Sequence, residues 1–356
     1  MKNIANKSSL EKYFLERNID KHSDNTKVTT FLSYSLGIIK SVKEPKLKVI
    51  ANEAGISVLE VSEFINDEFG LLNYENIFDE EIKKLDDLSS TILDSFVVLR
   101  ENNTKTETRN VFCSAQKRGV KGIEYLVMIG VKGNKTKVIG LKRLTKKPDL
   151  ITESINLIEN CLKYTRLGSV KGDNHFFHEF LINFLDEKGI AFISKPTRTG
   201  SWSGKQLKEC FSDVDVKGYR YHKGLYTKSL VLEHKIYGIC KIVRVKPSYR
   251  AEEKKCFYIV STGIKLSVMD IIKGKKQRWK IETVFRDCSQ NLGLRSCQCT
   301  KDKTIDNHVF MSFFSYNFLA EIKAVLCLTI GAIKRKIQAS LSVTTNVFDY
   351  FDREIA

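Results

Sequence analysis

The sequence predicts an α/β protein in which a basic, strand-rich insertion interrupts a mixed core and a wholly helical region precedes it. Apolar residues follow a helical period in residues 9–88, which predicts a helical domain over 1–88. From residue 91 the pattern changes to strands that alternate with helices, so we assign 89–194 to the first part of the core. Residues 195–255 hold short strand-like pieces between glycine- and lysine-rich turns, and 256–345 return to the core pattern.

The overall charge favours a polyanionic partner. The 356 residues carry 59 Lys and Arg against 42 Asp and Glu, a net charge of +17, and 42% of them are hydrophobic, enough for a sizeable core. An excess of this size is typical of proteins that bind nucleic acid, and a generally basic surface is the alternative.

This charge is unevenly distributed along the chain. Residues 1–88 hold 12 basic and 16 acidic residues, whereas 195–255 hold 15 basic and 6 acidic residues, a net of +9. We therefore expect the nucleic acid to contact the insertion and the C-terminal half more than the N-terminal region.

The cysteines and the N-terminus indicate a reducing cytoplasm. Nine cysteines lack the spacing of a secreted disulfide scaffold, and residues 1–12 contain no apolar signal core. No segment approaches the roughly 20 apolar residues of a membrane span, so no membrane partner is expected. Cys297 and Cys299 form a CxC pair without a second pair, which favours free thiols over a zinc site.

A helix-turn-helix outline lies within the N-terminal region. Residues 48–65 predict a helix, a turn at Gly55, a cap at Ser57 and a second helix. That second helix has no Lys or Arg and carries four acidic residues, namely Glu60, Glu63, Asp67 and Glu68. Because such a helix would repel phosphates, we favour a structural or docking domain over a sequence reader.

The elements of the core follow in order. The predicted strands are 91–99, 110–115, 124–131, 137–144, 168–171, 190–194, 241–245 and 256–261. The predicted helices are 149–164, 176–185, 267–277, 278–290 and 307–334. In the helix 176–185 one apolar face is expected, formed by Phe176, Phe177, Phe180, Leu181, Phe184 and Leu185.

Asp94 is the first candidate catalytic residue. It lies within a strand whose two faces are both mainly apolar. A carboxylate there is costly to desolvate, so a metal ion, an ion pair or access to water at a sheet edge must compensate it. The strand pattern does not choose between these alternatives.

Asp173 and Glu282 are the other two candidates. Asp173 follows a short strand and precedes a helix, where an N-cap is the simpler interpretation. Glu282 lies between Arg278 and Arg286 at helical spacing, which a solvated ladder of ion pairs would also explain. Together, however, Asp94, Asp173 and Glu282 supply three carboxylates on separate elements, the hard oxygen ligands that two Mg²⁺ ions need for phosphodiester chemistry.

The motifs around these carboxylates resemble bacterial insertion-sequence transposases of the DDE type, in particular the group with the Tyr-Arg-Glu-Lys signature. The resemblance covers roughly residues 90–320 and rests on Phe257–Thr262, Arg278–Asp287 and Gln290–Leu294, together with Ile92–Ser95 and Gly172–Asn174. It implies a ribonuclease-H-like core with a β-rich insertion between the second Asp and the Glu. The order of Asp94, Asp173 and Glu282 in this chain is similar.

The resemblance also implies the reaction and its partners. Water would cleave double-stranded DNA at an element end, and the freed 3′-hydroxyl would attack target DNA, with two Mg²⁺ ions (Mn²⁺ as a substitute) held by Asp94, Asp173 and Glu282. A homodimer in the synaptic complex and a nucleoid-associated location in a bacterium are implied as well. A nuclease of the same fold, or a catalytically degenerate DNA-binding descendant, is the alternative.

The expected DNA contacts come from the resemblance and from the basic insertion. The signature Arg and Glu match Arg278 and Glu282, whereas Lys275 stands where the signature has Tyr and Ser289 where it has Lys. We expect phosphate contacts from seven residues of α-helical or insertion segments: Lys275, Arg278, Lys280, Arg286, Lys241, Arg244 and Lys246. Trp202, on a glycine-flanked turn, could stack on a base or anchor a local core, and we favour the core.

Overall fold

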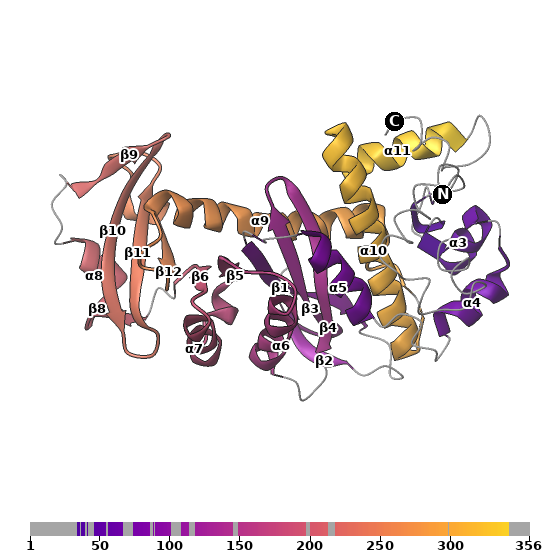
Figure 1. The fold of residues 1–356 in the computed structure, drawn as a ribbon, viewed down its shortest axis with the longest axis horizontal. Helices are drawn as coiled ribbons and strands as arrows, with labels where there is room; N and C mark the ends of the chain where they lie inside the picture. The colour runs from indigo at the N-terminus through magenta and orange to yellow at the C-terminus, as the bar shows by residue number, and fades with distance from the viewer. Residues whose placement is uncertain are drawn as a thin grey trace. The chain divides into compact units, whose positions relative to one another are not determined.

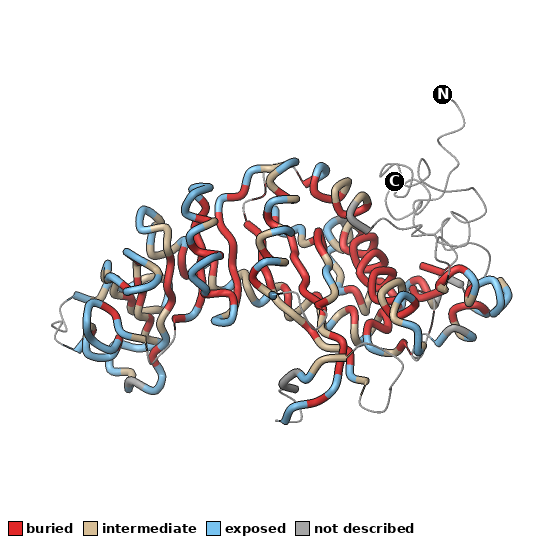
Figure 2. Tube along the Cα trace, turned by 90° about the horizontal axis from the view of Figure 1, so that it is seen from below, coloured by how far each residue is buried: buried red, intermediate tan, exposed pale blue. Residues whose placement is uncertain are grey.

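The structure is a computed structural model with strands and helices along most of the chain (Figure 1). It describes residues 34–35, 37–39, 41, 46–54, 56–66, 74–85, 88, 90–100, 108–113, 118–144, 149–196, 200–212, 218–297 and 299–341. Buried residues follow the central strands and the long helix α10, Asp302–Leu326 (Figure 2). None of the described helices is long and apolar enough to span a membrane.

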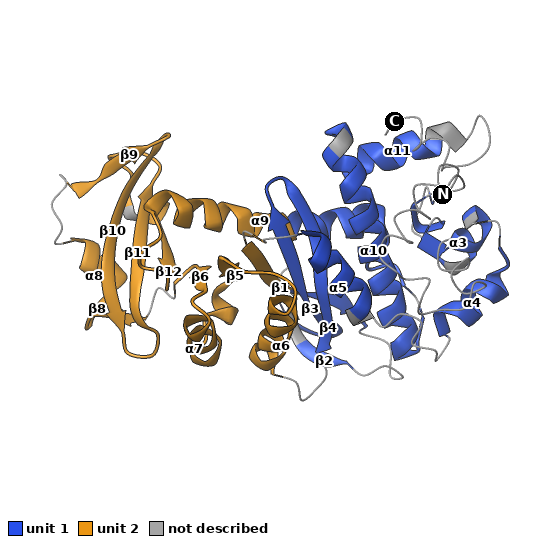
Figure 3. Ribbon diagram, in the orientation of Figure 1, with its two compact units in different colours: residues 1–86, 95–147, 282–356 blue, residues 87–94, 148–281 orange. Residues whose placement is uncertain are grey.

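The chain divides into two compact units (Figure 3). Unit 1 comprises residues 1–86, 95–147 and 282–356, and unit 2 comprises 87–94 and 148–281. The boundaries therefore fall within strand β1, Ser90–Leu99, and within helix α9, Val268–Asn291. The four domains predicted from the sequence group the residues differently and stay a prediction.

Two short helices in unit 1 form the predicted helix-turn-helix. They are α3, Leu47–Ala54, and α4, Val58–Asn66, and Gly55 lies outside the described residues. Ser57 starts α4 because its hydroxyl accepts from the Glu60 amide at 3.1 Å while the Glu60 carboxylate accepts from the Ser57 amide at 2.7 Å. The Ile65 carbonyl accepts from Asn307 of α10 at 2.8 Å, so α4 packs within unit 1.

The sheet of unit 1 is an antiparallel meander. The second half of β1 lies beside β3, Arg118–Lys132, which pairs with β2, Arg109–Cys113, on one side and β4, Lys135–Leu144, on the other. Helices α5, Tyr74–Leu85, and α10 pack against β4. The aromatic rings of Phe96, Tyr125, Phe285 and Phe313 form its core, with centroids 5.3–6.4 Å apart.

Three parallel strands begin the sheet of unit 2. The first half of β1 pairs with β5, Ser169–Lys171, and β5 pairs with β6, Ala191–Ser194. The connections carry helices α6, Leu150–Leu162, and α7, Glu179–Glu187, as parallel crossovers require.

The insertion continues the same sheet in unit 2. Its long strands are β10, Leu225–His234, and β11, Gly238–Lys246, with shorter pieces β7, Ser201–Trp202, β8, Lys205–Gln206, α8, Leu207–Ser212, and β9, Arg220–His222. A 3₁₀ turn at Glu253–Lys255 precedes β12, Phe257–Ser261, which pairs with β6 on one side and β11 on the other. The insertion is thus joined edge to edge with the core through β12.

Helix α9 is one helix of 24 residues, so the prediction of two helices over 267–277 and 278–290 was wrong. It stays continuous through Gly274 because that residue lies against the sheet. A Cβ atom there would stand 2.6 Å from Ile193 and 3.2 Å from the Lys171 side chain. Ile271 and Ile272 of α9 pack with Ile259 in a shared core.

Two other helix predictions also need correction. The helix expected over 176–185 begins only at Glu179, because a 3₁₀ turn at Asn174–Phe176 precedes it, and Phe180 is 66% exposed rather than on the buried face. The helix expected over 307–334 is two helices, α10 and α11, Ile330–Leu341. They separate where Cys327 adopts a left-handed φ of 53°.

Candidate active site

Asp94 lies near the middle of β1 and is half-buried. Its Oδ2 accepts from Arg278 Nη1 of α9 at 3.2 Å, with the side chains of Asp94 and Arg278 only 18% and 16% exposed. Of the alternatives that the strand pattern left open, this structure therefore contains the ion pair. Removal of either partner would break this half-buried ion pair.

Asp173 is an N-cap in this structure, as the simpler interpretation predicted. Its Oδ1 accepts from the His175 amide at 2.8 Å and so begins the 3₁₀ turn. That bond uses one of its two carboxylate oxygens, so capping does not exclude a second role. The preceding Gly172 is required for the close turn, because a Cβ there would stand 2.9 Å from the Cβ of Phe176.

The register of β1 and β5 places the two aspartates at equivalent positions. Thr91 lies opposite Val170 and Ile92 opposite Lys171 in a parallel ladder. The ladder ends at this pair, and its register, continued by two residues on both strands, would set Asp94 opposite Asp173. Neighbouring strands lie about 4.8 Å apart, so the fold of unit 2 brings these two carboxylates to one region of the sheet.

Glu282 lies within α9, at the point where unit 1 begins. Ile281, Val284 and Cys288 form the fully buried side of the helix here, and Glu282 itself is half-buried. Across the described residues, no group of three or more His, Cys, Asp and Glu side chains is arranged to hold a metal ion. Convergence of Glu282 with the two aspartates therefore stays a prediction.

The domain that holds these residues matches a known protein family. The model of the transposase DDE domain matches residues 91–318, well over half of the chain. The chain belongs to the DDE transposases. It is a DNA transposase, an enzyme of a family whose chemistry depends on divalent metal ions, while its place in the Tyr-Arg-Glu-Lys group stays a proposal.

A solved structure supports the fold of this transposase. The chain is similar to a piggyBac transposase in a cryo-EM structure of its synaptic complex with hairpin DNA. The TM-score is 0.52 at 12% sequence identity, and the match covers 93% of this chain and 73% of that one. The expected ribonuclease-H-like core is thereby confirmed, whereas comparison with curated proteins gives no match.

The donor set of the transposase fits a divalent metal ion by its chemistry. Asp94 on β1 and Asp173 just after the neighbouring β5 offer hard carboxylate oxygens, the type of ligand that Mg²⁺ and Mn²⁺ prefer. In this structure Arg278 holds one oxygen of Asp94, so its guanidinium supplies the positive charge that the carboxylate needs.

The predicted DNA-contacting cations of α9 differ in exposure. Arg286 is exposed, whereas Lys275, Arg278 and Lys280 are half-buried. Trp279, between two of these cations, is 60% exposed and was not singled out from the sequence. Its signal was present in the Arg-Trp-Lys run, since exposed aromatic rings among cations are typical of nucleic-acid surfaces.

Lys171 is a second residue that the sequence analysis missed. It is only 2% exposed on β5, two residues before Asp173, and its side chain covers Gly274 of α9. Burial, reinforced by the charge of Lys280, lowers the pKa of Lys171 to about 7. The one sequence signal was a lysine inside a short apolar strand.

The insertion residues predicted to bind DNA have local partners. Lys241 donates to the carbonyls of Leu266 and Ile264 at 2.8 and 3.3 Å. Arg244 and Lys246 both lie over the ring of Tyr219, at 5.9 and 4.9 Å from its centroid. All three cations are half-buried, so parts of each side chain remain accessible.

Trp202 is fully buried, which fits the core anchor that we favoured over base stacking. Its ring lies 4.7 Å from that of His234 and 6.4 Å from that of Phe177. Tyr237 completes the cluster, with its ring 4.0 Å from Phe177 and its hydroxyl donating to the Phe177 carbonyl at 2.9 Å. These contacts attach the start of the insertion to the segment that follows Asp173.

Proposed function

We propose that this transposase cleaves and joins DNA strands at the ends of an insertion sequence, with Asp94, Asp173 and Glu282 as its catalytic carboxylates. The observation that supports the proposal is the parallel pairing of β1 with β5, because Asp94 and Asp173 each lie two residues beyond the last pair of this ladder, Ile92 and Lys171. Two Mg²⁺ ions held by the three carboxylates, with Mn²⁺ as a substitute, would activate the attacking hydroxyl and stabilise the leaving oxygen.

In this proposal the cations of α9 contact DNA phosphates. Arg278 balances the charge of Asp94, and its guanidinium would turn to a DNA phosphate once Asp94 binds a metal ion instead. Lys275, Lys280 and Arg286 add positive charge along the same helix, where they would contact the DNA backbone.

The insertion would grip DNA outside the carboxylate region. Lys241, Arg244 and Lys246 follow one another along β11, and the surrounding segment carries the excess of basic residues. We further propose that the chain belongs to the group with the Tyr-Arg-Glu-Lys signature, with Lys275 and Ser289 as departures. It would act as a homodimer in the synaptic complex and work at the bacterial nucleoid.

A plasmid assay tests the catalytic proposal. The plasmid carries the DNA that flanks the coding segment on both sides, so that the element ends are present whatever their sequence. Asp94→Asn, Asp173→Asn and Glu282→Gln should each lower Mg²⁺-dependent cleavage on the order of 1,000-fold, as loss of several kcal/mol of transition-state stabilisation requires. Glu187→Gln, an exposed acid at the end of α7, is the matched control and should cleave normally.

Two further measurements separate catalysis from folding and binding. Each triad variant should bind plasmid DNA as the unaltered protein does, and calorimetric titration with Mn²⁺ should show weaker binding for the Asp94 and Asp173 variants. Full activity of any triad variant would refute the assignment. Cleavage without joined products would identify a nuclease instead of a strand-transfer enzyme.

A further inference from the structure

A cavity of about 520 Å³ lies in unit 2 between the β9–β10 hairpin, β11 and the start of α9. Its charged lining residues are Arg220, Lys228 and Lys241, with His222 beside them. Thr227, Ser229 and Ser267 also line it. No residue of the predicted triad lines this cavity, and of its cations only Lys241 was predicted to contact DNA.

The cavity is basic without a compensating acid. Its lining contains no Asp or Glu, and among the described residues neither Arg220 nor Lys228 forms an ion pair. Lys241 is held in place by its bonds to two backbone carbonyls, which satisfy only part of its three-donor ammonium group. Three cations that share one cavity repel each other, and a bound anion would remove that repulsion.

The start of α9 borders this cavity. Ser267, Val268 and Met269 line it, and backbone amides in the first turn of a helix have no acceptor within the helix. Asp270, on the same turn, already accepts from the Ser267 hydroxyl at 2.6 Å and lies 3.8 Å from Lys273. Its carboxylate is therefore engaged in capping α9.

We propose that this cavity is a phosphate-binding site, which takes a phosphodiester of DNA bound along the insertion. The inference rests on the proposed function, because it takes the anion from bound DNA. Arg220 and Lys228 would provide charge, Lys241 a fixed donor, and the Ser229 hydroxyl a neutral hydrogen bond. A volume of about 520 Å³ exceeds one phosphate and leaves room for the attached sugars.

The test measures how DNA affinity depends on salt for the full-length protein. Arg220→Gln and Lys228→Gln should each flatten the slope of log affinity against log salt by roughly 1, the value for one lost phosphate contact. Lys235→Gln is the matched control, since this exposed lysine lies at the far end of the β10–β11 hairpin and should leave the slope unchanged. Melting temperatures of all variants check that each one is folded.

A second arm identifies the source of the phosphate. Sodium pyrophosphate, at constant ionic strength, should compete with DNA for the unaltered protein and compete less for Lys228→Gln. If all variants keep the same salt slope, the proposal is overturned. Pyrophosphate could raise the melting temperature of the unaltered protein by more than it raises that of Lys228→Gln, while the salt slopes of the two proteins stay equal. In that case the cavity binds a free anion, and its assignment to DNA is overturned.

Neither arm depends on cleavage. The unaltered protein could fail to cleave DNA while Arg220→Gln still flattens the salt slope of DNA binding. The phosphate site would then be supported, and only the assignment of the catalytic carboxylates would be refuted. Conversely, active cleavage with unchanged slopes refutes the phosphate site and leaves the triad intact.

Discussion

Two buried lysines show how differently the two units treat charge. Lys137 of unit 1 is 4% exposed, lies 2.9 Å from Glu321 and 3.8 Å from Glu81, and also donates to the Asn317 carbonyl. Lys171 of unit 2 is 2% exposed and forms no ion pair with any described residue. Lys137 is thus buried with acidic partners that join elements of unit 1, whereas Lys171 is buried in unit 2 without such a partner among the described residues.

The largest expected effect is a difference in stability between variants that replace these two lysines. Lys137→Met should lower the free energy of unfolding by about 3–5 kcal/mol, because it removes a buried cation that lies 3.8 Å from the buried Glu81. Lys171→Met should leave stability unchanged or raise it, since it replaces a buried group whose charged form is disfavoured. Urea unfolding at neutral pH measures both.

A double variant shows whether the Lys137 effect comes from the pair. Lys137→Met combined with Glu81→Gln should recover part of the stability that Lys137→Met loses. If Lys137→Met and Lys171→Met lowered the free energy of unfolding equally, the contrast between a paired and an unpaired buried lysine would be refuted.

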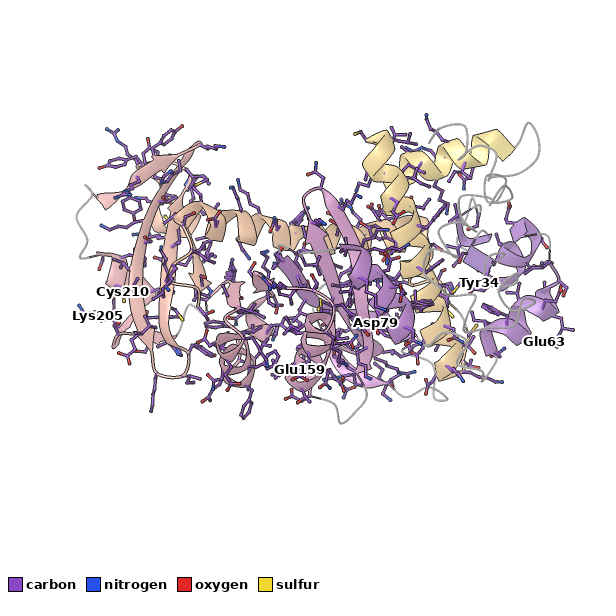
Figure 4. The ribbon with its side chains drawn as sticks, in the orientation of Figure 1. Tyr34, Glu63, Asp79, Glu159, Lys205 and Cys210 are labelled. Atoms are coloured by element: carbon purple, nitrogen blue, oxygen red, sulfur yellow. The ribbon has the colours of Figure 1, made fainter. Side chains whose placement is uncertain are left out.

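The pH dependence of stability should report the buried polar contacts of unit 1. The His308 ring forms two hydrogen bonds of 2.8 Å, one between Nδ1 and the hydroxyl of Tyr34 (labelled in Figure 4) and one between Nε2 and the Gly293 carbonyl. Because the Gly293 carbonyl can only accept, Nε2 carries the hydrogen and Nδ1 accepts from the Tyr34 hydroxyl. Burial lowers the pKa of His308 from 6.5 to about 4.

The sign of this effect follows from proton binding. Between pH 6.5 and 4 the unfolded chain binds a proton at this residue and the folded chain does not, so stability is complete above pH 6.5 and falls as the pH falls. The loss should reach about 3 kcal/mol near pH 4. His308→Gln should remove this part of the pH profile, while His178→Gln, at an exposed position, should retain it. A profile that His308→Gln does not alter would refute the assignment.

The smallest effect concerns how α9 is held in unit 2. Gly274→Ala should cost about 1–3 kcal/mol, because the added Cβ would stand 2.6 Å from Ile193 in a packed core. Gly119→Ala in unit 1 is the control, since no atom lies within 4 Å of its added Cβ. Equal thermal stability of both variants would show that α9 does not depend on this close contact.

Local patterns predicted most elements of the core. The alternation around Asp94 and the short strand before Asp173 were confirmed as β1 and β5, because strand periodicity depends on neighbouring residues alone. Helix boundaries were less predictable. The boundary expected between residues 277 and 278 does not exist, because α9 is continuous, and the 3₁₀ turn that Asp173 caps delays the start of α7 to Glu179.

The sequence by itself determined the α/β class, the basic insertion, the acidic second helix of the N-terminal region and the resemblance that singled out Asp94, Asp173 and Glu282. Only the tertiary structure decided that Arg278 pairs with Asp94, that β12 joins the insertion to the core sheet, and that Lys171 is buried without an ion pair among the described residues. The physical reason is distance along the chain. Periodicity and motifs come from residues that are close in sequence, whereas charge partners and burial depend on packing between segments as far apart as Asp94 and Arg278.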